Sequence, residues 1–261
     1  IRLFCNKAIF MDASLLSLLY IAVFGAALLQ AATGIGYGVI AGPIFLVVLN
    51  GVEAFQISAI HNILIAVLVA PFVFKNFSGS VMRPLLFGSL IGIPVGFALQ
   101  LFVGLLVLKC LSAVAVGFVA LNLAKSMRTG KASEARSNPS ASETGLIGGV
   151  SGVMGGMLAM PGPIVASWMS VRGFSKQEIR ATILTFAIFV YGSTVLLHAV
   201  YSGVAAETLR LSLISLPGVI AGVVAGSFVS RYLSETVFQR ILLVVLIATV
   251  ASLLVSVLWR I

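Results

Sequence analysis

The chain has 261 residues, of which 60% are hydrophobic and only 9% are charged, and its mean hydropathy is +1.18. An ordinary water-soluble domain carries about 25% charged residues, so this composition excludes one. Apolar runs of roughly 18 to 24 residues are long enough to cross a hydrocarbon core and show no two-residue alternation of a membrane β-barrel. They predict an all-α polytopic membrane protein.

The net charge of +9 comes from 16 Lys and Arg against 7 Asp and Glu. Basic residues at helix ends orient membrane helices and contact anionic headgroups, so membrane lipid is expected as a partner and nucleic acid is not. Cys5 and Cys110 lack the spacing of a disulfide framework or a metal site, and we expect neither metal nor cofactor. Residues 1–10 are interpreted as a leader, because the apolar pattern begins at Met11.

Breaks in the apolar pattern divide the chain into ten helical pieces. In the first half these pieces cover 14–31, 38–50, 54–75, 84–103 and 107–125. In the second half they cover 145–159, 163–171, 178–200, 209–230 and 237–259. The polar segment 126–143 between the halves is predicted to be a cytoplasmic linker. We therefore expect a single transmembrane domain, 1–261, with one repeat over 11–125 and a second over 144–261.

The two halves share a sequence pattern, which is a sign of an internal repeat. One spacing of glycine, alanine and proline occurs twice, as Gly34, Gly38, Ala41 and Pro43 and again as Gly152, Gly156, Ala159 and Pro161. In each half a short, interrupted helical pair precedes three full-length helices. If each pair is a hairpin, each half makes three net crossings, and the two repeats are inverted relative to each other.

The distribution of basic residues bears on this topology. With hairpins, 11 of the 16 Lys and Arg residues fall on one side and five on the other, which makes the first side cytoplasmic. The rival topology, in which each interrupted pair crosses once, gives 10 against 6. Inversion is preferred because transporter repeats commonly place a broken-helix site between them at the bilayer midplane.

The glycine and proline clusters interrupt helices at membrane depth. The residues concerned are Gly34, Gly36, Gly38 and Pro43 in the first half and Gly152, Gly155, Gly156, Pro161 and Pro163 in the second. A break exposes backbone N–H groups at a positive helix end, and glycine lets a ligand approach them closely. Two such ends, one per half, suit an anion. The alternative for any one cluster is close helix packing, but its recurrence with prolines at matching positions favours a site.

These motifs resemble those of the TauE/SafE family, the toluene-sulfonate uptake permeases. The resemblance covers nearly all of the chain after Met11: duplicated modules of three main helices, each opened by a glycine-rich stretch and a proline, with a polar loop between them. Tyr37 and Met154 stand where the family pattern has glycine. The resemblance implies transport of small sulfur-containing anions, such as sulfite, sulfoacetate or related organosulfonates, in the bacterial inner membrane.

Few polar residues lie inside the apolar runs. His61 and Asn62 follow the first interrupted pair, and Thr185 lies near their counterpart position in the second half. We expect these three and Tyr37 to contact the substrate, although His61 could instead join helices by hydrogen bonds. Gln30, Thr33 and Ser151 flank the breaks and are expected to satisfy freed backbone groups, the alternative being neutral donors to a bound anion. Arg180 is interpreted as a topology anchor, the alternative being a counter-charge for an anion near the cytoplasmic mouth.

The sequence thus predicts a transporter that works by alternating access at a midplane site. An enzyme is not expected, because no buried acid pair, metal cluster or nucleophile with a base can be recognised. The alternatives are a passive anion channel and a membrane accessory subunit. Coupling to a proton or another ion stays open, as does the oligomeric state. Gly222, far from the breaks, is expected to be a packing glycine that tolerates alanine.

Overall fold

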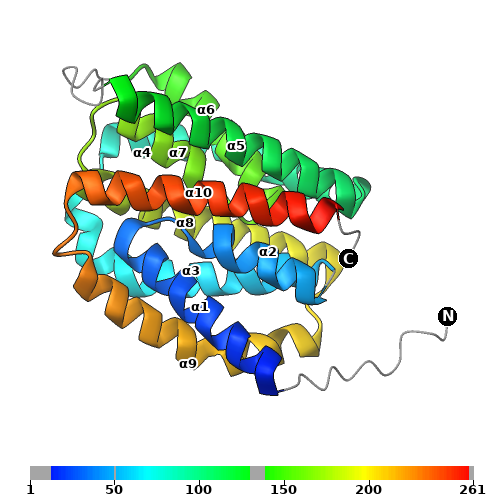
Figure 1. The fold of residues 1–261 in the computed structure, drawn as a ribbon. Helices are drawn as coiled ribbons and strands as arrows, with labels where there is room; N and C mark the ends of the chain where they lie inside the picture. Colours follow the sequence, from blue (N-terminus) through cyan, green and yellow to red (C-terminus); the bar gives the residue numbers. More distant parts are fainter. Residues whose placement is uncertain (1–12, 50, 130–138, 259–261) are drawn as a thin grey trace.

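Ten α-helices run through the parts of the chain that the computed structural model describes, residues 13–49, 51–129 and 139–258 (Figure 1). The first five are α1 (Ala13–Thr33), α2 (Tyr37–Leu49), α3 (Glu53–Val73), α4 (Gly79–Phe102) and α5 (Leu105–Thr129). The second five are α6 (Ala141–Leu158), α7 (Gly162–Val171), α8 (Lys176–Leu197), α9 (Ala206–Val229) and α10 (Glu235–Leu258). A 3₁₀ turn follows α3 and a π-helical turn follows α8. The leader expected at residues 1–10 lies outside the described residues.

The linker between the halves is shorter than the sequence predicts. Segment 126–143 is expected to be a loop, yet α5 continues to Thr129 and α6 starts at Ala141. The Ser140 hydroxyl accepts the Glu143 N–H at 3.2 Å and so caps the first turn of α6, while Glu143 is favourable at this positive helix end. Because of this cap, residues 141–143 form the first turn of α6, although their polar composition predicts a loop.

The prediction of an all-helical, multi-pass membrane protein is confirmed. Among the described residues, five helical segments are long and apolar enough to span a membrane: 53–76, 79–102, 176–202, 206–229 and 239–258. By contrast, α2 has 13 residues and α7 only 10. At 1.5 Å per residue these two measure about 20 and about 15 Å, too short to cross alone.

Helices of the first half pack mainly against helices of the second half. The pairs are α1 with α9, α4 with α6, α3 with α8 and α5 with α10 (Figure 1). The short helix α2 lies against α1 and α3, and α7 lies against α6 and α8. The two interrupted helical pairs are thus held inside a bundle whose longer helices come from both halves.

The closest of these helix pairs depend on glycine. A Cβ atom added to Gly222 of α9 would lie 2.8 Å from Cβ of Ala27 and 3.0 Å from the backbone nitrogen of Leu28 on α1. A Cβ on Gly152 of α6 would lie 2.8 Å from Cα of Ser89 on α4. Small residues allow such close backbone contact between membrane helices. The expectation that Gly222 tolerates alanine is therefore corrected, because the facing atoms are backbone atoms and the Cβ of Ala27, which cannot move aside.

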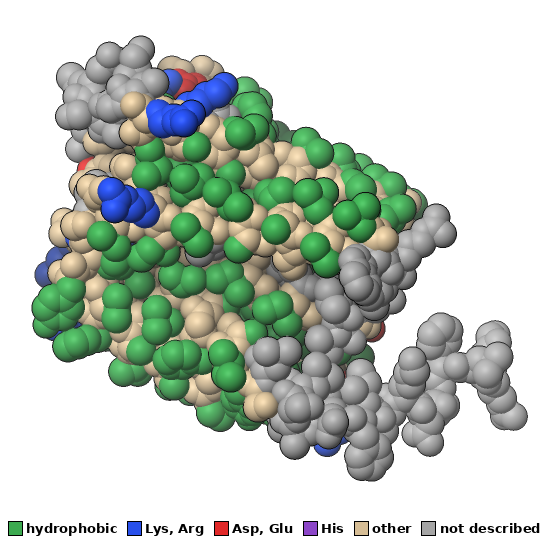
Figure 2. Space-filling model, viewed as in Figure 1, with side chains coloured by type: hydrophobic (Ala, Val, Ile, Leu, Met, Phe, Trp, Pro, Cys, Tyr) green, Lys and Arg blue, Asp and Glu red, His purple; other side chains and the backbone are tan. Residues whose placement is uncertain are grey.

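The surface of the bundle has a membrane-facing character. Figure 2 shows hydrophobic side chains over most of one face, with Lys and Arg gathered toward its left end, where α10 begins. Basic side chains belong at a membrane–water interface, and an apolar band belongs in the hydrocarbon core. This distribution fits a bundle whose long helices cross a membrane.

Gly222→Ala should lower the apparent melting temperature of the purified protein in detergent. Alanine favours a helix over glycine by about 1 kcal/mol, but overpacking costs about 1–3 kcal/mol, so the net effect is a loss of stability. Gly192→Ala in α8 is the matched control, because no atom lies within 4 Å of its added Cβ. Equal melting temperatures for the two variants would contradict glycine-dependent packing of α1 on α9.

Candidate functional site

The two helix breaks lie together and line one cavity with the middle of α8. Residues 34–36 separate α1 from α2, and residues 159–161 separate α6 from α7. The cavity has a volume of about 10 Å³, room for one water molecule at most. Its walls are Gln30, Gly34, Ile35, Gly36, Gly38, Val39, Met160, Pro161, Gly162, Pro163, Ile183, Ala187 and Tyr191. Because Ala187 lies near the middle of the 176–202 span, this site is deep in the bundle.

In the first break, glycine conformation and two side chains accommodate the freed backbone. Gly34 and Gly36 have φ values of +86° and +141°, which residues with a Cβ rarely adopt. The Thr33 hydroxyl accepts the Ile35 N–H at 3.2 Å, and Oε1 of Gln30 accepts the Tyr37 N–H at 3.1 Å. The expected role of Gln30 and Thr33 is thus confirmed.

In the second break, hydroxyl groups satisfy carbonyl oxygens. Helix α6 ends at Leu158, and the capping residue Ala159 has a φ of 54°, in the left-handed region. The Tyr191 hydroxyl donates to the Ala159 carbonyl oxygen at 3.2 Å, and the Ser151 hydroxyl donates to that of Pro161 at 2.6 Å. Pro161 and Pro163 stand at the start of α7, where a missing N–H removes no helical bond. The predicted role of Ser151 is confirmed as well.

The two breaks also touch each other. A Cβ atom on Gly38, in the first turn of α2, would overlap the carbonyl oxygen of Ala159 in the second break. A Cβ on Gly34 would lie 3.2 Å from Cα of Arg180 on α8. These glycines therefore let backbone approach backbone, and their lack of a side chain brings the two halves together at the cavity.

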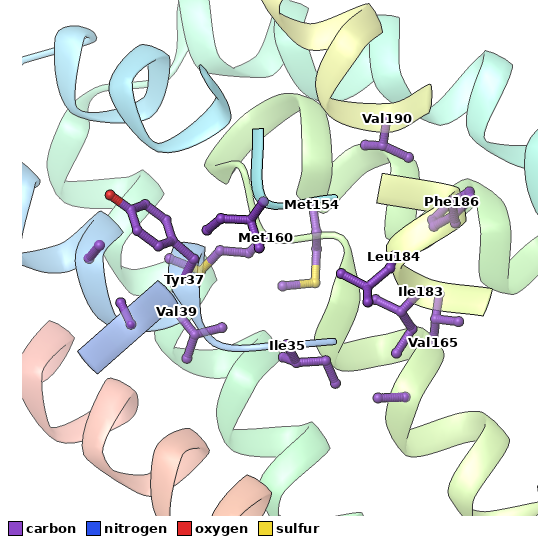
Figure 3. Packing of buried hydrophobic residues seen from close by; sticks show 14 of the residues in the cluster. Ile35, Tyr37, Val39, Met154, Met160, Val165, Ile183, Leu184, Phe186 and Val190 are labelled. Carbon is purple, nitrogen blue, oxygen red and sulfur yellow. The ribbon is translucent and has the colours of Figure 1, made fainter. Parts of the chain in front are cut away.

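The side chains that line the cavity are mostly apolar, with Gln30 and Tyr191 as the polar exceptions. Figure 3 shows Ile35, Val39 and Met160 near the breaks, with Ile183 and Val165 across from them, while the Tyr37 ring points away. The first turns of α2 and α7 contribute Gly38 and Gly162 to its wall. A helix start carries unpaired N–H groups and a partial positive charge. Since the lining includes no Lys or Arg, attraction for an anion comes from the backbone and from the neutral polar side chains of Gln30 and Tyr191.

Residues 19–253 match the family described as Sulfite exporter TauE/SafE. The chain belongs to this family. No curated protein and no solved structure matches it. Membership makes the chain a membrane transporter of the TauE/SafE family rather than an enzyme, and the resemblance seen in the glycine motifs is confirmed.

Tyr37, which stands at a glycine position of the TauE/SafE pattern, reaches a buried histidine. Its hydroxyl lies 2.5 Å from Nδ1 of His61, and Nε2 of His61 lies 3.0 Å from the Ser212 carbonyl oxygen. Because a carbonyl only accepts, Nε2 carries the proton and Nδ1 accepts from Tyr37. His61 is 1% exposed and joins α3 to α2 and α9. Neither His61 nor Tyr37 lines the cavity, so the geometry favours helix joining over substrate contact.

Asn62 is the expected polar residue that borders the breaks. Its Nδ2 donates to the Ser58 carbonyl oxygen at 2.8 Å and lies 3.5 Å from the position of an added Gly38 Cβ. Its Oδ1 is buried and has no hydrogen-bond partner among the described residues. A buried amide oxygen without a partner is costly, so this amide has capacity for a further hydrogen bond.

Other predicted site residues lie apart from the cavity. Gly152 and Gly156 pack against α4, and Gly155 packs against Pro161 and Val190 behind the break. Thr185 is two residues from Ile183, about 200° around α8 from the lining face. None of these four lines the cavity. The glycine pattern of α6 thus serves packing as well as the break, which spacing alone does not separate.

The assignment of Pro43 to the first helix break is wrong. Helix α2 runs without interruption from Tyr37 to Leu49, so Pro43 lies within it. The interruption comes earlier, at Gly34 and Gly36, where the backbone has positive φ. Pro161 and Pro163 do mark their break, because they occupy the start of α7.

Sequence reasoning missed the α8 wall of the cavity. Ile183, Ala187 and Tyr191 recur every four residues and therefore share one helix face. The sequence does contain a signal, since Tyr191 is a polar aromatic residue within an apolar run. Every face of α8 is apolar enough to be buried, however, and the lining face is identified only by the packing.

Tyr37→Phe should lower the melting temperature of this TauE/SafE protein. Loss of the hydroxyl leaves Nδ1 of buried His61 without a partner, which costs about 1–3 kcal/mol. Tyr201→Phe is the control, because Tyr201 is 72% exposed. Thermal unfolding in one detergent compares the two, and an unchanged Tyr37→Phe melting temperature would show that this hydrogen bond contributes little.

Proposed function

We propose that this protein carries small sulfur-containing anions, such as sulfite, sulfoacetate or related organosulfonates, across the bacterial inner membrane. Carriage would occur by alternating access at the cavity between the breaks. One observation carries the proposal: the starts of α2 and α7, one from each half, line a single cavity deep in the bundle. Family membership supports the anionic sulfur substrate.

The electrostatics of the cavity suit an anion that must be released again. A partly buried helix N-terminus favours a negative charge by up to about 2 kcal/mol, but α7 offers less than this because Pro161 and Pro163 carry no N–H. Asn62 adds no donor here, because its unpartnered Oδ1 only accepts hydrogen bonds and the residue does not line the cavity. Without Lys or Arg in its lining, the site offsets dehydration of the anion but does not hold it permanently.

The packing of the helices supports two repeats related by a twofold axis, as inverted repeats require. Exchanging α1–α5 with α6–α10 turns the α1–α9 contact into the α6–α4 contact and the α2–α10 contact into the α7–α5 contact. The α3–α8 and α5–α10 contacts exchange into themselves. Such reciprocity is expected when two equivalent units face each other across a shared site.

The size of the cavity favours a carrier over a channel. At about 10 Å³ it has room for one water molecule at most, so a sulfur oxyanion enters only if α2 and α7 move relative to α8. A channel needs a path continuous enough for ions to pass between neighbouring sites. A cavity too small for the anion in this conformation fits a carrier that opens its site to one side at a time better than a continuous pore.

Ala187→Val should abolish anion transport in proteoliposomes while the protein remains folded. The two added methyl groups fill the cavity, which has room for one water molecule at most. Uptake of sulfite, thiosulfate, sulfoacetate, taurine and acetate is measured with and without a pH gradient, which also reveals coupling to protons. Anion-dependent thermal stabilisation of the purified protein should disappear in the same variant.

Ala221→Val is the matched control, since Ala221 is an exposed alanine of α9 outside the cavity. It should transport like the unmodified protein. Retained transport by Ala187→Val at normal KM would remove the cavity from the transport path. Transport of only cations or neutral solutes would overturn the anion assignment.

Single cysteines at Ser142 and Ser202 should react from opposite sides of the membrane, with Ser142 cytoplasmic. If α6 and α7 form a hairpin that enters and leaves on one side, α8 alone carries the chain across between these positions. The experiment uses a background with Cys5 and Cys110 replaced by serine and a membrane-impermeant thiol reagent. Labelling of both positions from one side would contradict inverted repeats and favour one crossing per interrupted pair.

A further inference from the structure

A lipid-facing groove runs between the C-terminal halves of α3 and α9, apart from the cavity at the breaks. It has a volume of about 570 Å³. Its apolar walls include Phe72 of α3 and Val224 and Phe228 of α9, which are 87%, 66% and 60% exposed. These side chains are on the outside of the bundle, where acyl chains rather than water surround a membrane protein.

One end of the groove is basic and polar. Arg180 and Arg231 line it together with Ser227 and Ser230. Arg180 and Ser230 also line an adjoining niche of about 30 Å³, to which Lys176 and Gln177 contribute. The groove therefore has a long apolar part and, at one end, a small pocket with cationic and hydroxyl side chains.

The two arginines have no acidic partner in the described part of the chain. Ion pairs there join Arg172 to Glu143 and Arg210 to Glu207. The Nε of Arg180 donates to the Ala31 carbonyl oxygen at 2.7 Å, which fixes the guanidinium group beside the end of α1. Two neighbouring cationic side chains without an acidic partner give a positive potential at this point, which attracts an anionic group.

The length of the groove matches one leaflet of a bilayer. From Val229, the last residue of α9, back to Ile220 the helix rises about 14 Å at 1.5 Å per residue, and Arg231 lies just beyond its end. This is about half of a hydrocarbon core of roughly 30 Å. A free phosphate or sulfate would use only the basic end, whereas a phospholipid would fill both the basic end and the apolar length.

We propose that this groove is a binding site for one anionic phospholipid, with its phosphate at Arg180, Arg231 and Ser230 and an acyl chain along Phe72, Val224 and Phe228. The site is separate from the cavity and does not depend on the substrate. Arg180 also touches the first break, since its Cα lies 3.2 Å from an added Gly34 Cβ. A lipid phosphate bound to Arg180 would therefore be separated from Gly34, which lines the cavity, by Arg180 alone.

Native mass spectrometry of the delipidated protein in detergent tests the proposal. Phosphatidylglycerol is compared with phosphatidylcholine of identical acyl chains, and inorganic phosphate is tested alone by thermal stabilisation. Phosphatidylglycerol should bind at least fivefold more tightly than phosphatidylcholine. Arg231→Gln should weaken phosphatidylglycerol binding about fivefold, the effect expected of one basic residue at a membrane surface. Val224→Trp should weaken both lipids by filling the apolar length.

Matched controls separate the groove from general attraction. Arg240→Gln removes one exposed charge at the same end outside the groove, and Leu213→Trp adds an indole to an exposed position elsewhere on α9. Both should bind lipid like the unmodified protein. The proposal fails if Arg240→Gln weakens binding as much as Arg231→Gln, or if Val224→Trp has no effect. If inorganic phosphate raised the melting temperature as much as phosphatidylglycerol does, the basic end would be a site for free phosphate. If the protein were a dimer that Val224→Trp dissociates with or without lipid, the groove would be an interface between two copies of this chain.

Discussion

Backbone N–H and C=O groups inside a hydrocarbon core must find partners within the protein, because lipid offers none. Long helices meet this requirement internally, but the interruptions at residues 34–36 and 159–161 do not. Gln30, Thr33, Ser151 and Tyr191 supply the missing partners, and the surrounding helices exclude lipid. The position of the breaks inside the bundle, and hence the position of the cavity, follows from this constraint.

Glycine has two uses in this protein that depend on the same missing side chain. At Gly34 and Gly36 it permits positive φ, which ends α1 and starts α2 in a new direction. At Gly152, Gly156 and Gly222 it permits close helix packing, which holds the bundle around the breaks. Gly38 combines close packing with a place in the cavity wall, since it rests on the Ala159 carbonyl oxygen.

No Lys or Arg side chain lines the cavity at the breaks, although Arg180 packs beside the first break. Figure 2 shows basic side chains gathered toward one end of the visible face. An anion at the breaks would thus meet backbone dipoles, while fixed positive charges act at the membrane surface. Such an arrangement keeps binding moderate at depth, as transport requires, and keeps basic groups where anionic lipid can reach them.

The sequence alone determines the helical class, the two halves and the existence of two breaks, because apolar run length and glycine spacing are local properties. It also identifies Gln30, Thr33 and Ser151 as residues that satisfy freed backbone, since they adjoin the breaks. Which glycines line the cavity, which face of α8 closes it and whether His61 meets substrate or helix are decided by packing between distant segments. Gly152 and Gly34 look equivalent in spacing, yet α4 covers one and the cavity opens beside the other. Only the tertiary structure supplies those neighbours.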